Sequence, residues 1–120
     1  MKILLVEDDP EVRNTTIHLL ENLGCTVVAV AGAFEAISSF NEQSNSIDLV
    51  LTDYSMPDIN GIELAMNLKR IKPDIPIILC TGIHTSTDLK DISGSGVSEI
   101  LSKPYSKTEL NLALQRAAEK

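Results

Sequence analysis

The sequence predicts an α/β protein in which one doubly wound parallel sheet is covered by helices on both faces. Five short apolar runs recur at intervals of a little over twenty residues, and amphipathic helical patterns fill the gaps between them. The runs are continuously apolar rather than alternating, which is typical of parallel strands buried on both faces. Strict alternation of strand and helix indicates a (βα)5 arrangement. We therefore expect strand order 2-1-3-4-5, with its topological switch between the first and third strands.

Each predicted strand is short and rich in aliphatic residues. The five strands are expected at residues 3–6, 27–30, 49–51, 77–79 and 100–101. Pro73 and Pro76 separate the third helix from the fourth strand, because proline interrupts both kinds of element.

Apolar residues three and four positions apart predict five helices. The first stripe consists of Val12, Thr16, Leu19, Leu20 and Leu23; the second of Ala33, Ala36, Ile37 and Phe40; the third of Leu64, Ala65, Leu68 and Ile71; a weaker fourth of Leu89 and Ile92; and the fifth of Leu110, Ala113, Leu114 and Ala117. Asp9 precedes Pro10 and is interpreted as the cap of the first helix, which Gly24 should end.

Composition limits the classes of function. The chain has 120 residues, and we expect one domain over residues 1–120. Its 10 basic and 17 acidic residues give a net charge of −7, with no basic cluster that would bind nucleic acid or an anionic membrane directly. The start lacks a signal peptide and no run approaches a membrane span, so we expect a cytoplasmic protein. Cys25 and Cys80 form no CxxC pattern and are interpreted as reduced thiols.

Acidic residues follow two of the predicted strands. Glu7 and Asp8 follow the first strand, and Asp53 ends the third, so the three carboxylates flank the switch point of the sheet. Carboxylates that converge at one edge repel each other unless a cation lies between them, and Mg²⁺ prefers such oxygen ligands. The alternative is that Glu7 and Asp8 are solvated loop acids. Gly61 is expected to relieve a crowded backbone near the start of the next helix.

Two further polar residues end the remaining strands. Thr81 follows the fourth strand and Lys103 the fifth, which brings both to the same edge as Asp53. A carboxylate can attack phosphorus to form an aspartyl phosphate, while a cation and a hydroxyl stabilise the charge of the phosphoryl group. Taken alone, Thr81 and Lys103 would each be interpreted as an ordinary surface residue.

Four segments together resemble the receiver domains of two-component response regulators. They are residues 6–10 (VEDDP), 53–57 (DYSMP, with Gly61), 80–82 (CTG) and 103–105 (KPY). The resemblance extends over the whole chain in order and spacing, and it implies a flavodoxin-like fold. It also implies that the chain signals by changing its partners and is not an enzyme, apart from self-catalysed phosphorylation and dephosphorylation.

The resemblance assigns a role to each site residue. Asp53 would accept a phosphoryl group from a sensor histidine kinase or a histidine phosphotransfer domain. Asp8 and Asp53 would bind Mg²⁺ directly, Glu7 would bind it through water, and the main-chain carbonyl of Ser55 would complete the protein ligands. Thr81 would be the switch hydroxyl and Lys103 the cation that pairs with the phosphoryl group. The Lys103–Pro104 peptide would be cis.

The chain departs from the family pattern three residues before Lys103. Receivers often carry an aromatic ring there, which couples the site to the face made by helix 4, strand 5 and helix 5. This chain has Ile100, so we expect weaker coupling to that face, which is also the face through which a homodimer would form. Residues 74–82 (DIPIILCTG) look like the corresponding segment of receivers attached to hybrid histidine kinases.

Two other classes of function stay open. A Mg²⁺-dependent phosphohydrolase could act through an aspartyl phosphate, but hydrolases of the haloacid-dehalogenase kind place a second Asp two residues after the nucleophile, where this chain has Ser55. A degenerate receiver could serve only as a binding surface.

Overall fold

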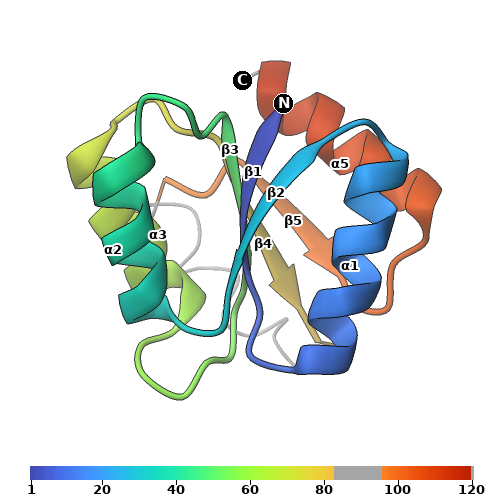
Figure 1. Ribbon diagram of the computed structural model, residues 1–120, viewed down its shortest axis with the longest axis horizontal. Helices are drawn as coiled ribbons and strands as arrows, with labels where there is room; N and C mark the ends of the chain where they lie inside the picture. The colour runs from blue at the N-terminus through green and yellow to red at the C-terminus, as the bar shows by residue number, and fades with distance from the viewer. Residues whose placement is uncertain (83–95, 120) are drawn as a thin grey trace.

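A parallel sheet with helices on both faces forms the centre of the computed structural model, which describes residues 1–82 and 96–119 (Figure 1). The strand order is β2-β1-β3-β4-β5, as the sequence predicts, and every pairing is parallel. The strands are β1 (Lys2–Val6), β2 (Thr26–Val30), β3 (Leu49–Asp53), β4 (Ile77–Thr81) and β5 (Glu99–Ser102). The described helices are α1 (Pro10–Asn22), α2 (Ala33–Gln43), α3 (Gly61–Ile71) and α5 (Lys107–Glu119). The fourth helix predicted around Leu89 and Ile92 lies outside the described residues.

The sheet separates two apolar cores. On one face α2 and α3 cover the strands, and on the other α1 and α5 do so (Figure 1). Alternate residues of β1 point to opposite cores, Leu4 to the α2–α3 side and Leu5 to the α1–α5 side. Phe40 is fully buried and is the largest such side chain on the first side. The predicted burial of the strands on both faces thus follows from their place between two helical layers.

The ends of α1 form as the sequence predicts. Asp9 adopts an extended backbone and its carboxylate accepts hydrogen bonds from the amides of Glu11 and Val12. Gly24 follows the helix with φ of +86°, a conformation that glycine adopts without steric cost.

Two strands are less buried than predicted. Ala29 of β2 and Ile100 of β5 are exposed, whereas β1 and β4 are buried almost throughout. The reason is their position, because β2 and β5 are the outer strands of the sheet and their helical cover is incomplete. Ile71 of α3 is also exposed, at 37%, so the apolar stripe of that helix ends one turn earlier than predicted.

Strand register brings all five C-terminal ends to one edge of the sheet. Val6 of β1 lies beside Thr52 of β3, Asp53 lies beside Cys80 of β4, and Thr81 lies beside Ser102 of β5. This edge, at the bottom of the sheet in Figure 1, is where the predicted site residues meet.

Candidate functional site

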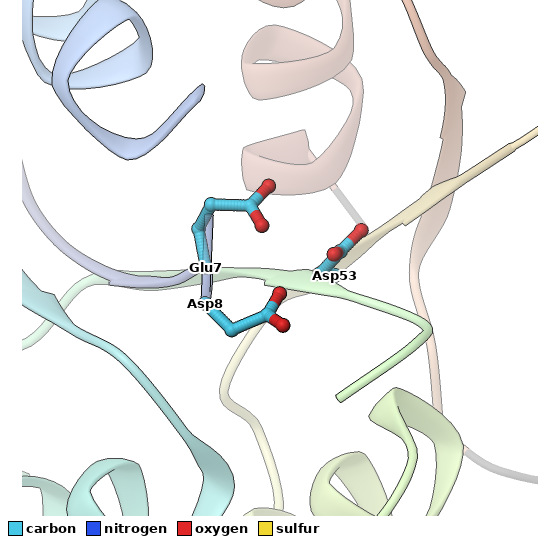
Figure 2. Close-up of side chains that lie close together, drawn as sticks. All are labelled: Glu7, Asp8 and Asp53. Atoms are coloured by element: carbon cyan, nitrogen blue, oxygen red, sulfur yellow. The ribbon is translucent and has the colours of Figure 1, made fainter. Parts of the chain in front are cut away.

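Three carboxylates converge at the switch point of the sheet. Glu7 and Asp8 follow β1 directly and Asp53 ends β3, and one oxygen of each lies within 4.8 Å of the others. Figure 2 shows the carboxylates of Glu7 and Asp8 extending toward the side of Asp53. Glu7 is only 4% exposed, so its charge needs a compensating partner. This oxygen-rich donor set fits a hard divalent cation such as Mg²⁺.

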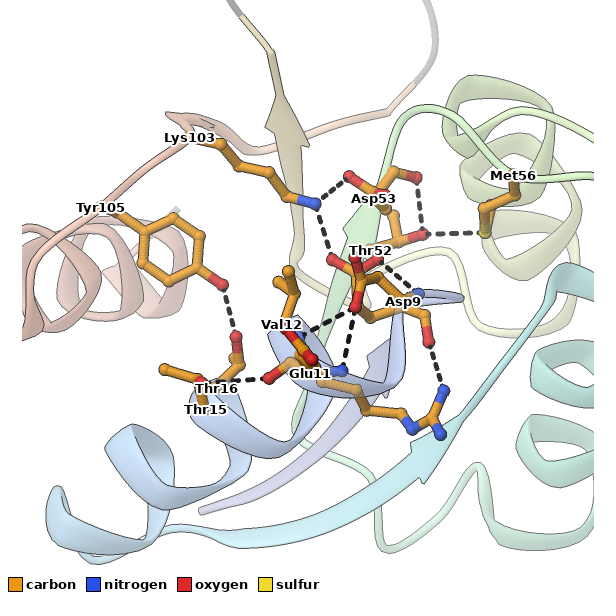
Figure 3. A network of polar contacts seen from close by, with 12 residues as sticks. Asp9, Glu11, Val12, Thr15, Thr16, Thr52, Asp53, Met56, Lys103 and Tyr105 are labelled. Carbon is orange, nitrogen blue, oxygen red and sulfur yellow. Dashed lines mark hydrogen bonds and ion pairs between the residues drawn. The ribbon is translucent and has the colours of Figure 1, made fainter.

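Lys103 provides a positive charge inside this cluster. Its ammonium nitrogen lies 2.6 Å from Oε1 of Glu7 and 2.7 Å from Oδ1 of Asp53, and Figure 3 shows the Asp53 contact. Burial lowers the pKa of Lys103, but hydrogen bonds to the two carboxylates outweigh it and raise the pKa above its usual range. The sequence placed Lys103 at this edge but did not reveal its bridge to Glu7.

Thr81 is held close to Lys103 by the backbone. Thr81 ends β4 and is 5% exposed, and its carbonyl accepts a hydrogen bond of 2.8 Å from the Lys103 amide. The Lys103–Pro104 peptide is cis, as expected. The hydroxyl of Thr81 and the ammonium group of Lys103 therefore belong to adjacent strand ends beside Asp53.

The loop after Asp53 approaches β3 closely at Gly61. The Gly61 amide donates to the Tyr54 carbonyl at 2.8 Å. A Cβ atom on Gly61 would lie 2.4 Å from the carbonyl oxygen of Asp53 and 2.6 Å from Cδ1 of Leu79. No real Cβ tolerates such distances, which confirms that glycine relieves a crowded backbone here. Ser55, the source of the expected main-chain ligand, lies in this loop and is exposed.

Glu7 is fixed from two sides by neighbours that the sequence analysis did not select. The Asp9 amide donates to Oε2 of Glu7 at 3.2 Å, and Nη1 of Arg13 donates to the Glu7 carbonyl at 3.0 Å. The sequence offered one signal for this contact, a basic residue (Arg13) in the first turn of the helix that follows Glu7 and Asp8. These contacts hold the turn between β1 and α1 in shape.

A tyrosine joins the loop after β5 to α1. The Tyr105 hydroxyl lies 2.8 Å from Oγ1 of Thr16, a contact drawn in Figure 3. Burial raises the pKa of Tyr105 to about 12 and also raises the pKa of the neighbouring Cys80 thiol. Both Cys80 and Cys25 are free thiols, as predicted. A hollow of about 600 Å³ between α1 and this loop opens beside Lys103.

The arrangement can support attack by a carboxylate on phosphorus. Asp53 offers an oxygen nucleophile, Lys103 a positive charge beside it, and Thr81 a hydroxyl on the adjoining strand end. All six residues that the sequence singled out, including Ser55 in the adjoining loop, lie at or beside one edge of the sheet.

Known structures and sequences identify the family to which this fold belongs. The fold is that of a solved response regulator receiver domain protein from Clostridium thermocellum, with a TM-score of 0.93, 30% identity and coverage of 98% of this chain and 94% of that one. The family model for the response regulator receiver domain matches residues 3–115. The chain belongs to this family, the receiver domains of two-component signalling systems.

Relatives of different length carry similar receivers. The response regulator receiver protein CpdR of Brucella abortus is 34% identical over 109 residues, which cover 91% of this chain and 89% of CpdR. The sensor kinase CckA of the same species is 30% identical over 98% of this chain but only 12% of its own length. The chain spans 12% to 21% of the length of CckA and several other long relatives.

Membership of this family carries general properties with it. Receiver domains take part in phosphoryl transfer, interact with histidine kinases or phosphotransfer proteins, and typically bind Mg²⁺ at an acidic pocket. In this chain, Glu7, Asp8 and Asp53 form an acidic cluster that could hold a metal ion. Across residues 1–82 and 96–119, no helix is both long and apolar enough to cross a membrane.

Proposed function

We propose that Asp53 accepts a phosphoryl group from the phosphohistidine of a sensor kinase or phosphotransfer domain, and that this switches the partners of the chain. The observation that carries the proposal is the position of the Asp53 carboxylate, 2.7 Å from the Lys103 ammonium group and within one cluster with Glu7 and Asp8. In the transfer, an Asp53 oxygen forms a bond to phosphorus as the bond from phosphorus to the histidine nitrogen breaks. Asp53 is then a mixed anhydride, and the histidine leaves with the bonding electron pair.

The metal requirement rests on the donor set. Asp8, Asp53 and the Ser55 carbonyl would hold Mg²⁺, with Glu7 reaching it through water. When bound, this ion would offset the negative charge of the incoming phosphoryl group. Lys103 now holds Glu7 and Asp53 together, and it would turn toward a phosphoryl oxygen after transfer while keeping its charge at the site.

Thr81 provides the switch in this proposal. Its hydroxyl would donate a hydrogen bond to a phosphoryl oxygen, which would draw the end of β4 toward Asp53. The same main-chain contact that joins Thr81 to Lys103 would carry the movement to the loop after β5.

A single experiment separates this function from its alternatives. The protein is incubated with acetyl phosphate and Mg²⁺, and its intact mass is followed with time. One phosphoryl adduct that maps to Asp53 is the expected result, and Asp53→Asn should lose it while keeping the fold because the amide is nearly isosteric. Rapid multiple turnover of acetyl phosphate would favour the Mg²⁺-dependent phosphohydrolase. No adduct would favour a receiver that acts only as a binding surface.

We further infer the setting in which the chain works. The net charge of −7 and the free thiols support a cytoplasmic domain whose partners are proteins rather than nucleic acid or membrane. A homodimer, where one forms, would use the face around β5 and α5, on which Ile100 and Leu112 are exposed at 37% and 42%. Analytical ultracentrifugation with and without beryllofluoride tests this; no change in mass at high protein concentration would contradict phosphorylation-driven dimerisation.

A further inference from the structure

The start of α2 lacks a cap of its own. Gly32 stands at the capping position and has no side chain to accept hydrogen bonds from the first amides of the helix. These amides need acceptors from elsewhere. Asp58, 24 residues away along the chain from Phe34, fills this role, because its Oδ2 accepts a hydrogen bond of 3.0 Å from the Phe34 amide.

The fit between Gly32 and Asp58 is close. A Cβ atom on Gly32 would lie 3.2 Å from Oδ2 of Asp58, which is tighter than an ordinary contact. Burial acts to raise the pKa of Asp58, but hydrogen bonds from backbone amides, including those of Phe34, Ala33 and Ile59, together outweigh it, so the pKa lies below its usual range. Asp58 is exposed to solvent, and its carboxylate is nevertheless held in place by these hydrogen bonds.

Asp58 belongs to the loop between β3 and α3, which runs directly from Asp53 past Ser55. In Figure 1 this loop passes beside the connection between β2 and α2. Its two ends are anchored, since the Gly61 amide donates to the Tyr54 carbonyl at 2.8 Å and Asn60 caps α3. The Asp58 contact anchors the stretch between them to a different helix.

The backbone path of this stretch decides where the Ser55 carbonyl points. A carbonyl in an exposed loop can bind a metal ion only if the loop spends little free energy in adopting the required path, and residues beyond the first ligands commonly provide that order. Ser55 lies three residues before Asp58 and belongs to no helix or strand.

We propose that Asp58 is a positioning residue for the metal site: by capping α2 it holds the loop between β3 and α3 in the path that presents the Ser55 carbonyl to the carboxylate cluster. This inference rests on the proposed function, in which that carbonyl is a Mg²⁺ ligand. Asp58 itself does not touch the metal. It also makes the start of α2 part of the site, because any shift of Ser55 on metal binding is felt at the Phe34 amide.

The test compares substitutions that separate charge from hydrogen bonding. Asp58→Ala removes both, Asp58→Asn keeps an oxygen that can cap the helix, and Asp74→Ala removes an equal charge from an exposed position after α3. Mg²⁺ affinity is measured by isothermal titration calorimetry, and the Phe34 amide is followed by NMR during the titration. A folded state is verified by circular dichroism.

The expected result is that Asp58→Ala raises the Mg²⁺ dissociation constant about threefold to tenfold, while Asp58→Asn and Asp74→Ala stay within about twofold of the parent. The Phe34 amide should shift with Mg²⁺ in the parent and not in Asp58→Ala. Gly32→Ala, which crowds the carboxylate from the other side, should weaken Mg²⁺ binding in the same direction.

Four outcomes would overturn the inference. Parental affinity in Asp58→Ala would show that the contact does not order the ligand, and equal losses in Asp58→Ala and Asp58→Asn would show that charge alone acts. If Asp58→Ala does not fold, unchanged Mg²⁺ affinity in Gly32→Ala would likewise show that the contact does not order the ligand. A parent that does not bind Mg²⁺ at all would instead overturn the metal site of the proposed function and this inference with it.

Discussion

Replacing Gly61 by alanine should displace Asp53, the proposed phosphoacceptor, without altering any polar group of the site. The added Cβ would meet the Asp53 carbonyl oxygen at 2.4 Å and Leu79 Cδ1 at 2.6 Å. Ordinary contacts between such atoms are about 3.4 Å or longer, so the two backbone segments must separate by about 1 Å. Leu79 can adjust its rotamer, but the carbonyl belongs to the central strand β3 and cannot.

The cost of this clash can be worked out. Overpacking typically costs about 1 to 3 kcal/mol, and an immovable backbone obstacle places Gly61→Ala near about 3 kcal/mol. With an unfolding entropy of about 2.1 cal/mol/K per residue, a chain of this size loses about 4 °C of melting temperature per kcal/mol, or about 12 °C in all. A misplacement of about 1 Å at a reacting group should slow adduct formation with acetyl phosphate on the order of 100-fold.

Gly82→Ala is the matched control. A Cβ on Gly82 meets nothing within 4 Å, although Gly82 lies at the same edge of the sheet. Its melting temperature should stay within about 3 °C of the parent, since no clash arises. Differential scanning calorimetry and intact mass spectrometry measure both quantities. If Gly61→Ala melts and reacts like Gly82→Ala, the close approach of Gly61 to Asp53 is not a constraint on the site.

Three further outcomes are expected. Asp8→Ala should raise the melting temperature of the metal-free protein, because like charges a few ångströms apart cost on the order of 1 kcal/mol or more. The same substitution should abolish the increase in melting temperature that millimolar Mg²⁺ causes in the parent. A parent whose melting temperature in scanning fluorimetry does not respond to Mg²⁺ would contradict the metal site. In the folded protein the pKa of Tyr105 is raised to about 12. The stability that this residue contributes is therefore complete below its unfolded pKa of about 10 and is lost as pH rises through about 12. The raised pKa of Lys103 acts in the same direction. The free energy of unfolding, measured in urea, should therefore fall less steeply with pH over this alkaline range in Tyr105→Phe than in the parent. Equal slopes in the two proteins would show that the phenol is not responsible. Beryllofluoride should shift backbone NMR signals along α5 less than at Thr81, because the β-branched Ile100 has no ring to reorient, and large shifts throughout α5 would show that Ile100 transmits the change.

Much of the site could be predicted because topology places it. In a sheet of alternating strands and helices, every strand delivers its C-terminal end to one edge, so residues that follow apolar runs must converge there. Asp53, Thr81 and Lys103 were found in this way, without knowledge of any contact. Asp9 and Gly24 were found for a different reason, since capping depends on residue type and immediate neighbours alone.

Features that depend on the surroundings of a segment were missed. Ala29 sits in a run as apolar as those of the central strands, yet it is exposed because β2 has a neighbour on one side only. The bridge from Lys103 to Glu7 and the cap that Asp58 places on α2 join residues far apart in sequence. Such pairs depend on loop paths and side-chain rotamers, for which periodicity holds no signal.

The bridge between Glu7 and Lys103 spans 96 positions of the chain, and this separation has a consequence for biosynthesis. A ribosome adds about 5 to 20 residues per second, so the acids exist for several seconds before the lysine is made. During that interval a nascent chain carries Glu7, Asp8 and Asp53 without their cation, and contacts of such long range close late in folding. In the proposed function, competence to accept a phosphoryl group would therefore arise only when β5 has joined the sheet. Under the proposed function, a kinase that meets a chain without β5 would find Asp53 without the lysine that pairs with the phosphoryl group.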